Sequence, residues 1–249
     1  MAEQTSQSQG PLLEAIGASV QRTPSQGVLI ADINWQVAAG EYWVVGGPHG
    51  CGKSAFLATM AGLLPPAAGV IRHFGRDLSC FPEAESIAQR TRVGFVFKGG
   101  GRMFPQLTVA ENVALPLRYH HDWTGEEAAE PVQALLEITG LTPLAASAAQ
   151  TLTTGWQQRV GLARALALEP EVLFLDEPMA GLEAAHRLWW RNFLDQLSRG
   201  APWTRERKIT LIAATSDFSL WSGARRHFAL LNHGRWQLLG ERADIPEMN

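Results

Sequence analysis

The sequence predicts an α/β fold whose core is a mostly parallel sheet with helices on both faces. Short apolar runs alternate with helical patterns along most of the chain, which is the pattern of parallel strands joined by crossover helices. A glycine-rich turn stands between one such run and a helix, and two acids close another run, Val172-Leu-Phe-Leu. These features place a ligand at the carboxyl ends of the strands.

The first half of the chain supplies most of the predicted strands. Residues 12–20 and 28–37 alternate in hydrophobicity and are expected to form an antiparallel layer beside the ligand. Residues 41–45 are expected to form a buried strand that leads through the glycine turn into a helix at 54–61. Two further strands are expected at 69–75 and 92–97.

The second half begins with a helical segment. Thr108 is a candidate cap for a helix at 109–117, and Pro131 should either begin a second helix, at about 126–139, or kink it. Later elements are expected as helices at 156–168 and 183–199, strands at 172–176 and 209–214, and a hairpin of 227–231 with 235–239. We therefore expect one domain over 11–240 with an inserted helical lobe at about 99–155, a disordered tail at 1–10 and a C-terminal tail at 241–249.

Composition narrows the classes of function. The chain has 249 residues, 46% of them hydrophobic, which suffices for one large core. No apolar run is long enough to cross a bilayer, and the polar start lacks the features of a secretory signal. The net charge of −3 gives no basis for nucleic-acid binding. Two cysteines cannot form a disulfide framework, which favours the cytosol.

The glycine-rich turn matches the spacing G-x-x-x-x-G-K-[ST]. In this pattern, glycines let backbone N–H groups face a polyphosphate, the lysine reaches the outer phosphates and the serine hydroxyl ligates Mg²⁺. Cys51 is read as a small residue at a variable position, with a reactive thiol near a helix N-terminus as the alternative. The predicted phosphate-binding residues are Gly47, Pro48, His49, Gly50, Cys51, Gly52, Lys53 and Ser54.

Two adjacent carboxylates complete the predicted chemistry. Asp176 and Glu177 follow an apolar strand, at the sheet edge where such folds bind ligands. Asp176 is expected to hold Mg²⁺ together with Ser54, and Glu177 to act as general base toward the water that attacks the γ-phosphate. Without a phosphate loop nearby, such a pair would be read as a solvated strand end.

The ordered set of motifs resembles the nucleotide-binding subunits of the ABC ATPase family, over about residues 12–239. The resemblance rests on 47–54, Phe95-Val-Phe-Lys98, Leu152-Thr-Thr-Gly-Trp-Gln-Gln-Arg159, 173–178 and Gly181-Leu-Glu183, in that order. It implies a P-loop ABC-type domain that binds ATP and Mg²⁺. It further implies a homodimer or heterodimer in which Thr153 and Gly155 of one subunit contact ATP held by the other.

The resemblance also implies a transmembrane permease as partner, docked on the helical lobe. The expected location is the cytoplasmic side of the cell membrane, with the chain held there through the permease. The segment 107–118 looks most like subunits of Mla-type lipid-trafficking systems, which work with MCE-type lipid-binding proteins, although related segments occur in lipoprotein-release and cell-division members.

Several positions depart from the family pattern. Lys98 stands where glutamine is usual, Ser216 replaces the switch histidine, and Thr154 replaces a glycine of the signature. Glu183 replaces aspartate, a milder change. No aromatic residue is placed to stack on adenine; Arg22 could do so through its guanidinium, and a solvated turn charge is the alternative.

These departures leave two functions open. The first is an ATPase that drives a transporter, slowed by the loss of the histidine and helped by the charge of Lys98 on the γ-phosphate. The second is an ATP-binding regulatory or structural subunit with weak or no hydrolysis at its own site, which Glu177 argues against. A DNA-repair or translation role is disfavoured, since the chain has neither a long coiled-coil insertion nor two such domains.

Overall fold

The computed structural model describes residues 10–21, 27–78, 83–221 and 225–240. Its strands are β1 (Leu13–Gln21), β2 (Val28–Val37), β3 (Tyr42–Gly46), β4 (Ala68–His73), β5 (Arg76–Asp77), β6 (Val93–Val96), β7 (Val172–Asp176), β8 (Thr210–Thr215), β9 (His227–Asn232) and β10 (Arg235–Gly240). Its α-helices are α1 (Lys53–Met60), α2 (Glu83–Thr91), α3 (Val109–His121), α4 (Ala129–Thr139), α5 (Thr154–Leu166) and α6 (Ala184–Arg199).

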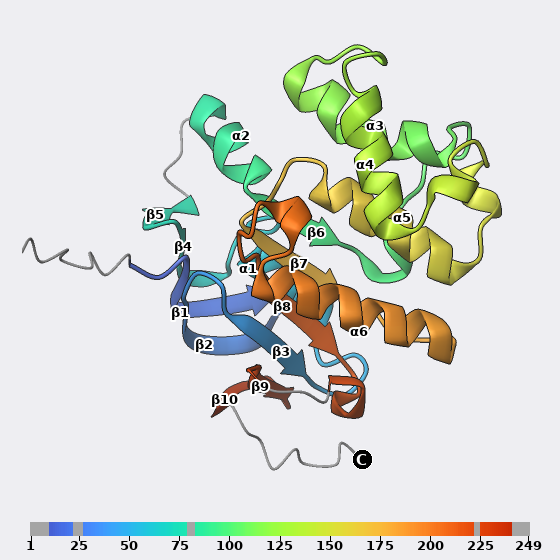
Figure 1. The fold of residues 1–249 in the computed structure, drawn as a ribbon. Helices are drawn as coiled ribbons and strands as arrows, with labels where there is room; N and C mark the ends of the chain where they lie inside the picture. The colour runs from blue at the N-terminus through green and yellow to red at the C-terminus, as the bar shows by residue number, and fades with distance from the viewer. Residues whose placement is uncertain (1–9, 22–26, 79–82, 222–224, 241–249) are drawn as a thin grey trace, which may run out of the picture.

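The central sheet has the order β10-β9-β3-β8-β7-β6 (Figure 1). Its pairs are parallel except for β10, which lies antiparallel to β9 at one edge. Every residue of β3, β7 and β8 is buried, which explains their uninterrupted apolar sequences. The predicted α/β class with a mostly parallel core sheet is confirmed.

A second sheet, with the order β2-β1-β4-β5, is antiparallel throughout. It packs on α1 and on one face of the central sheet through a shared core. The indole of Trp35 in β2 makes edge contact with that of Trp43 in β3, with ring centroids 5.3 Å apart, and lies 5.7 Å from the ring of Phe56 in α1. The predicted antiparallel layer is therefore present and rests against the helix that follows the glycine turn.

Helices α3 and α4 pack with α5 around a core of their own, to one side of the strands in Figure 1. Thr108 caps α3 in a capping box with Glu111, as predicted. Pro131 lies in the first turn of α4, so it helps to begin that helix. The boundaries of a helical lobe at about 99–155 stay a prediction. The expected tails at 1–10 and 241–249 lie, except for Gly10, outside the described residues.

Three details differ from the sequence expectations. Helix α2 was not predicted, because its sequence Glu-Ala-Glu-Ser-Ile-Ala-Gln-Arg-Thr has too few apolar residues to show a helical stripe. Helix α3 continues to His121 rather than ending at Leu117. Helix α5 begins at Thr154, before Trp156, because Thr153 is extended and takes the cap position.

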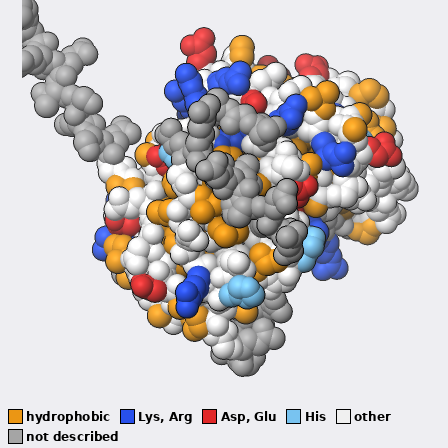
Figure 2. All heavy atoms as spheres, turned by 90° about the horizontal axis from the view of Figure 1, so that it is seen from below, with side chains coloured by type: hydrophobic (Ala, Val, Ile, Leu, Met, Phe, Trp, Pro, Cys, Tyr) orange, Lys and Arg blue, Asp and Glu red, His pale blue; other side chains and the backbone are white. Residues whose placement is uncertain are grey.

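Over the part of the chain that the structure describes, no helix combines the length and apolar character needed to cross a membrane. Figure 2 shows one face of the molecule, on which basic and acidic side chains are interspersed with hydrophobic atoms. The surface charge on this face does not single out a functional site. The site is found instead from the geometry around the glycine turn.

Candidate functional site

The loop between β3 and α1 has the backbone of an anion cradle. Gly50 and Gly52 have φ of 82° and 103°, a region that other residues enter at a cost. A Cβ on Gly47 would lie 2.4 Å from the carbonyl oxygen of Leu231, so only glycine fits there. Gly52 is the N-cap of α1 and offers no side-chain cap, which leaves first-turn N–H groups available to phosphate oxygens.

Lys53, the first residue of α1, is buried and points back into this loop. Its Nζ donates hydrogen bonds to the carbonyl oxygens of Gly47 (2.8 Å) and Pro48 (3.1 Å). The same Nζ lies 3.2 Å from Oε1 of Glu177, at the end of β7. Both side chains are almost fully buried, so this ion pair is poorly screened by solvent. The lysine therefore links the glycine loop to the strand that carries the acids.

Asp176 is the last residue of β7 and is 5% exposed. Burial is the main effect on its carboxyl and raises the pKa. A hydrogen bond from Ser54 lowers the pKa, and the nearby negative charge of Glu177 raises it. Its Oδ1 is buried and has no hydrogen-bond partner among the described residues. A buried, unpartnered carboxylate oxygen beside a serine hydroxyl is a donor set that fits Mg²⁺.

Glu177 has φ of 49°, in the left-handed region that a glutamate rarely adopts. Its backbone N–H donates to Ala214 O at the end of β8. Its Oε2 accepts two hydrogen bonds from Ser216, one from the backbone N–H and one from the hydroxyl, both at 3.1 Å. Ser216, at the position of the expected switch histidine, thus holds the carboxylate whose other oxygen faces Lys53.

These groups meet in a cleft of about 490 Å³. Its walls include Phe95 and Phe97 from the end of β6 and Lys98 just after it. Of the predicted site residues, it is lined by His49, Gly50, Gly52, Lys53, Ser54, Lys98, Asp176 and Glu177. Gly47, Pro48 and Ser216 lie next to it through their contacts with Lys53 and Glu177.

Three of the predicted residues that the structure describes, Thr153, Gly155 and Cys51, are not among those that line this cleft. Thr153 and Gly155 lie at the start of α5. Arg22 lies outside the described residues. Cys51 packs beside Gly47, and burial raises the pKa of its thiol, which keeps it protonated rather than reactive.

The segment that carries Lys98 is locked onto α5. Lys98–Gly100 forms a short 3₁₀ turn, η2, in which Gly100 has φ of 86°. A Cβ on Gly100 would lie 2.2 Å from the carbonyl oxygen of Gln157, and one on Gly161 would lie 2.5 Å from that of Gly100. Two backbones therefore meet here with no side chain between them.

The start of α5 shows a residue that the sequence analysis did not single out. The ring of His186, from α6, covers Gly155 so closely that a Cβ there would lie 2.8 Å from it. His186 also makes edge contact with Trp156, and its Nδ1 is buried without a partner among the described residues. The sequence contains no motif that would predict this role for His186, because the contact joins α5 and α6, which are separated in sequence.

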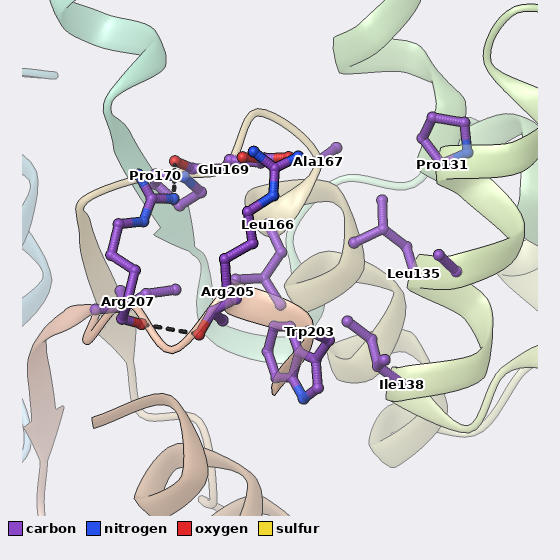
Figure 3. Close-up of a pocket in the computed structure, with 13 residues that line it drawn as sticks. Pro131, Leu135, Ile138, Leu166, Ala167, Glu169, Pro170, Trp203, Arg205 and Arg207 are labelled. Atoms are coloured by element: carbon purple, nitrogen blue, oxygen red, sulfur yellow. Dashed lines mark hydrogen bonds between the residues drawn. The ribbon is translucent and has the colours of Figure 1, made fainter. Parts of the chain in front are cut away.

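A separate pocket of about 180 Å³ lies between α4, the end of α5 and the loop after α6 (Figure 3). Leu135 and Ile138 of α4 face Trp203 across it, and Arg205 and Arg207 stand at its rim. It contains none of the predicted phosphate-binding or acidic residues. The cleft at the glycine loop is therefore the candidate site.

Comparison with solved structures gives the same fold. The chain superposes on the ATP-binding cassette MJ0796, in a dimeric post-hydrolysis state bound to ADP and Pi, with a TM-score of 0.80 and 25% identity, covering 93% of this chain and 99% of that one. A second dimeric structure of MJ0796, described as a bacterial ABC transporter cassette, gives a TM-score of 0.79 at 24% identity.

Sequence relatives are longer than this chain. It is 35% identical to the sulfate/thiosulfate import ATP-binding protein CysA of Synechococcus elongatus, over 94% of this chain and 65% of that protein. It is 33% identical to the spermidine/putrescine import ATP-binding protein PotA of Chromobacterium violaceum, over 88% and 56%. The chain thus spans about two thirds or less of the relatives it matches. The ABC transporter family model matches residues 30–180, more than half of the chain, and the chain belongs to the ABC transporter family.

Proposed function

We propose that this chain is the ATP-binding and ATP-hydrolysing subunit of a membrane transporter. The observation that carries the proposal is the meeting of Lys53, Asp176 and Glu177 beside the glycine loop, within one cleft. A lysine, a metal-ligating acid and a second acid are the groups that phosphoryl transfer to water requires.

In the proposed site, the loop 47–54 binds the phosphates through backbone N–H groups and Lys53. Asp176 and Ser54 would hold Mg²⁺, which neutralises charge on the phosphate oxygens. Phosphates compete with Glu177 for Lys53, so nucleotide binding frees Oε1 of Glu177 to accept a proton from the attacking water. The two hydrogen bonds from Ser216 hold the carboxylate in place meanwhile.

The partners are part of the proposal. Two copies, or this chain and a related subunit, would pair so that Thr153 and Gly155 of one contact the ATP of the other. A permease would hold the pair at the cytoplasmic face of the membrane. The dimeric form of the solved cassettes that this chain resembles supports such pairing.

Two classes of cargo are in question. By its resemblance, the segment 107–118 favours phospholipid trafficking with an MCE-type protein. In the structure, Thr108 and Glu111 form the capping box of α3, and Asn112 is buried with hydrogen bonds to Phe104, Leu107 and Thr108. These contacts build the helix start whatever the cargo is. The relatives are named for sulfate, Fe³⁺ and spermidine import, which supports a small-solute importer as the second candidate.

Two measurements test this function. Purified chain should bind ATP in the presence of Mg²⁺, and Lys53→Ala should weaken binding at least tenfold, because it removes a charged contact to phosphate. Affinity purification of the tagged chain from detergent-solubilised membranes should recover a permease, and the accompanying proteins separate lipid from solute transport. Undiminished ATP binding by Lys53→Ala would contradict the proposed phosphate site, and an eluate without a permease would contradict the proposed transporter role.

The regulatory alternative keeps ATP binding but not hydrolysis. The departures from the family pattern at Thr154, Lys98 and Ser216 favour this alternative. Without the histidine, about 2 to 4 kcal/mol of transition-state stabilisation would be missing, on the scale of single preorganised donors. Glu177 and its hydrogen bonds from Ser216 favour hydrolysis.

Substitution of Lys98 tests whether its charge takes part in hydrolysis. If its charge acts on the γ-phosphate, the wild type hydrolyses ATP slowly and Lys98→Gln lowers kcat about tenfold further. Arg235→Gln, which removes an exposed cation from β10, should leave kcat unchanged and serves as the control. Wild-type turnover at an ordinary rate, unaffected by Lys98→Gln, would show that Lys98 has no such role.

A further inference from the structure

A second polar pocket, of about 580 Å³, lies at the end of the central sheet opposite the nucleotide cleft. Its walls include Tyr42, at the start of β3, and Lys208, just before β8. Both strands run from this pocket toward the candidate site: β3 ends at the glycine loop, and β8 ends next to Ser216. The pocket shares no residue with the nucleotide cleft.

Positive charge is in excess in this pocket. Arg199, Lys208 and Arg225 line it, against a single lining carboxylate, Asp195. That carboxylate is already paired with the buried guanidinium of Arg226, while Arg199 approaches its other oxygen only to 3.9 Å. Neither Lys208 nor Arg225 has an ion-pair partner within the described ranges. Three cations thus converge where one acid is already neutralised, in a chain whose net charge is −3.

A buried hydroxyl in the wall also lacks a partner. Tyr42 is 3% exposed, and its hydroxyl has no hydrogen-bond partner among residues that the structure places. The guanidinium of Arg226 lies 4.9 Å from the ring centroid of Tyr42 and can only donate. Burial raises the pKa of Tyr42 well above its ordinary value, so the hydroxyl keeps its proton. The Tyr42 hydroxyl is thus a donor without an acceptor, since the lining carboxylate of Asp195 is paired with Arg226, and a buried unsatisfied donor is costly.

We propose that this pocket binds a small multivalent oxyanion, such as pyrophosphate, sulfate or the phosphate group of a metabolite, between Arg199, Lys208 and Arg225, with Tyr42 donating from the wall. An oxyanion supplies the acceptor that the Tyr42 hydroxyl lacks, and charge-assisted hydrogen bonds from lysine and arginine are the strongest contacts available to it. The inference does not depend on the proposed ATPase function, because the residues are different ones.

Pyrophosphate binding to the full chain, measured by calorimetry at constant ionic strength, tests the proposal. Since the glycine loop should bind pyrophosphate too, four proteins are compared: wild type, Lys53→Ala, Lys208→Gln/Arg225→Gln, and the three substitutions together. We expect two sites in the wild type. Lys208→Gln/Arg225→Gln should weaken one of them at least tenfold and leave the other, and Lys53→Ala should do the reverse. Sulfate and inorganic phosphate, titrated separately, report which oxyanion is preferred.

A charge-matched control and a variant of the buried tyrosine complete the test. Arg118→Gln/Arg235→Gln removes the same charge from exposed positions elsewhere and should change neither site. Tyr42→Phe should raise Tm slightly without anion, because an unsatisfied buried hydroxyl is removed, and should weaken pyrophosphate binding about threefold. Unchanged binding in Lys208→Gln/Arg225→Gln overturns the proposed pocket, and this includes the outcome in which only Lys53→Ala loses a site. An equal loss in the Arg118/Arg235 control overturns it as well.

Discussion

Glu177→Gln is expected to lower ATP turnover about 10²- to 10³-fold while ATP binding is retained, because it removes the proposed general base. Glutamine keeps the size of the side chain, and its amide oxygen can still accept the hydrogen bonds that Ser216 donates to Oε2. Lys53 loses its ion pair with Oε1, so phosphate no longer competes with a carboxylate for Nζ. ATP affinity should therefore stay the same or rise.

The matched control is Glu171→Gln, just before β7, at the other end of the strand that leads to Glu177. Glu171 pairs with Arg92 and is partly exposed, so its loss should change kcat by less than twofold. Steady-state hydrolysis and equilibrium nucleotide binding are measured on both variants with Mg²⁺ present. Turnover by Glu177→Gln at the wild-type rate would remove Glu177 from the mechanism, and wild-type protein with no turnover at all would leave the regulatory reading.

Gly100→Ala is expected to destabilise the fold by about 3 kcal/mol, from backbone strain and overpacking together. The added Cβ would stand 2.2 Å from Gln157 O, a backbone atom in α5 that cannot move without the helix. The φ of 86° adds strain for any L side chain. Urea unfolding followed by tryptophan fluorescence measures the change.

Gly99→Ala is the control for the strain component alone. Gly99 also has positive φ, 69°, but a Cβ there meets nothing within 4 Å. We expect it to cost about 1 kcal/mol, the ordinary penalty for leaving glycine in this region. Equal losses in the two variants would show that the contact between η2 and α5 contributes little.

Sequence reasoning located the strands whose residues are all buried. Strands β3, β7 and β8 have no exposed face, so each appears in the sequence as an uninterrupted apolar run. A glycine turn or acidic residues mark where these runs end. Thr108 was predicted as a helix cap because threonine is a favoured N-cap residue and a helical pattern follows it. These features are local, and a single sequence contains them.

Contacts between residues on strands that are adjacent in the sheet but distant in sequence could not be predicted from the sequence. Strand β8 lies between β3 and β7, and this brings Ser216 to Glu177, 39 residues apart in sequence. The sequence indicates only that Ser216 stands in place of a histidine, whereas the structure shows that it donates two hydrogen bonds to the Glu177 carboxylate. The pocket around Lys208 and Arg225 combines cations from separate loops, and no sequence spacing indicates that they meet.

The glycine contact between η2 and α5 has a consequence for the proposed pair of subunits. Lys98 lines the cleft of its own chain, whereas the start of α5 would face the nucleotide of the partner. Since Gly100 and Gly161 leave no room for the two segments to slide, they must shift as one body. A subunit that hydrolyses slowly would thus still signal the arrival of its own nucleotide to the other site, and so help to set the order of events in the pair.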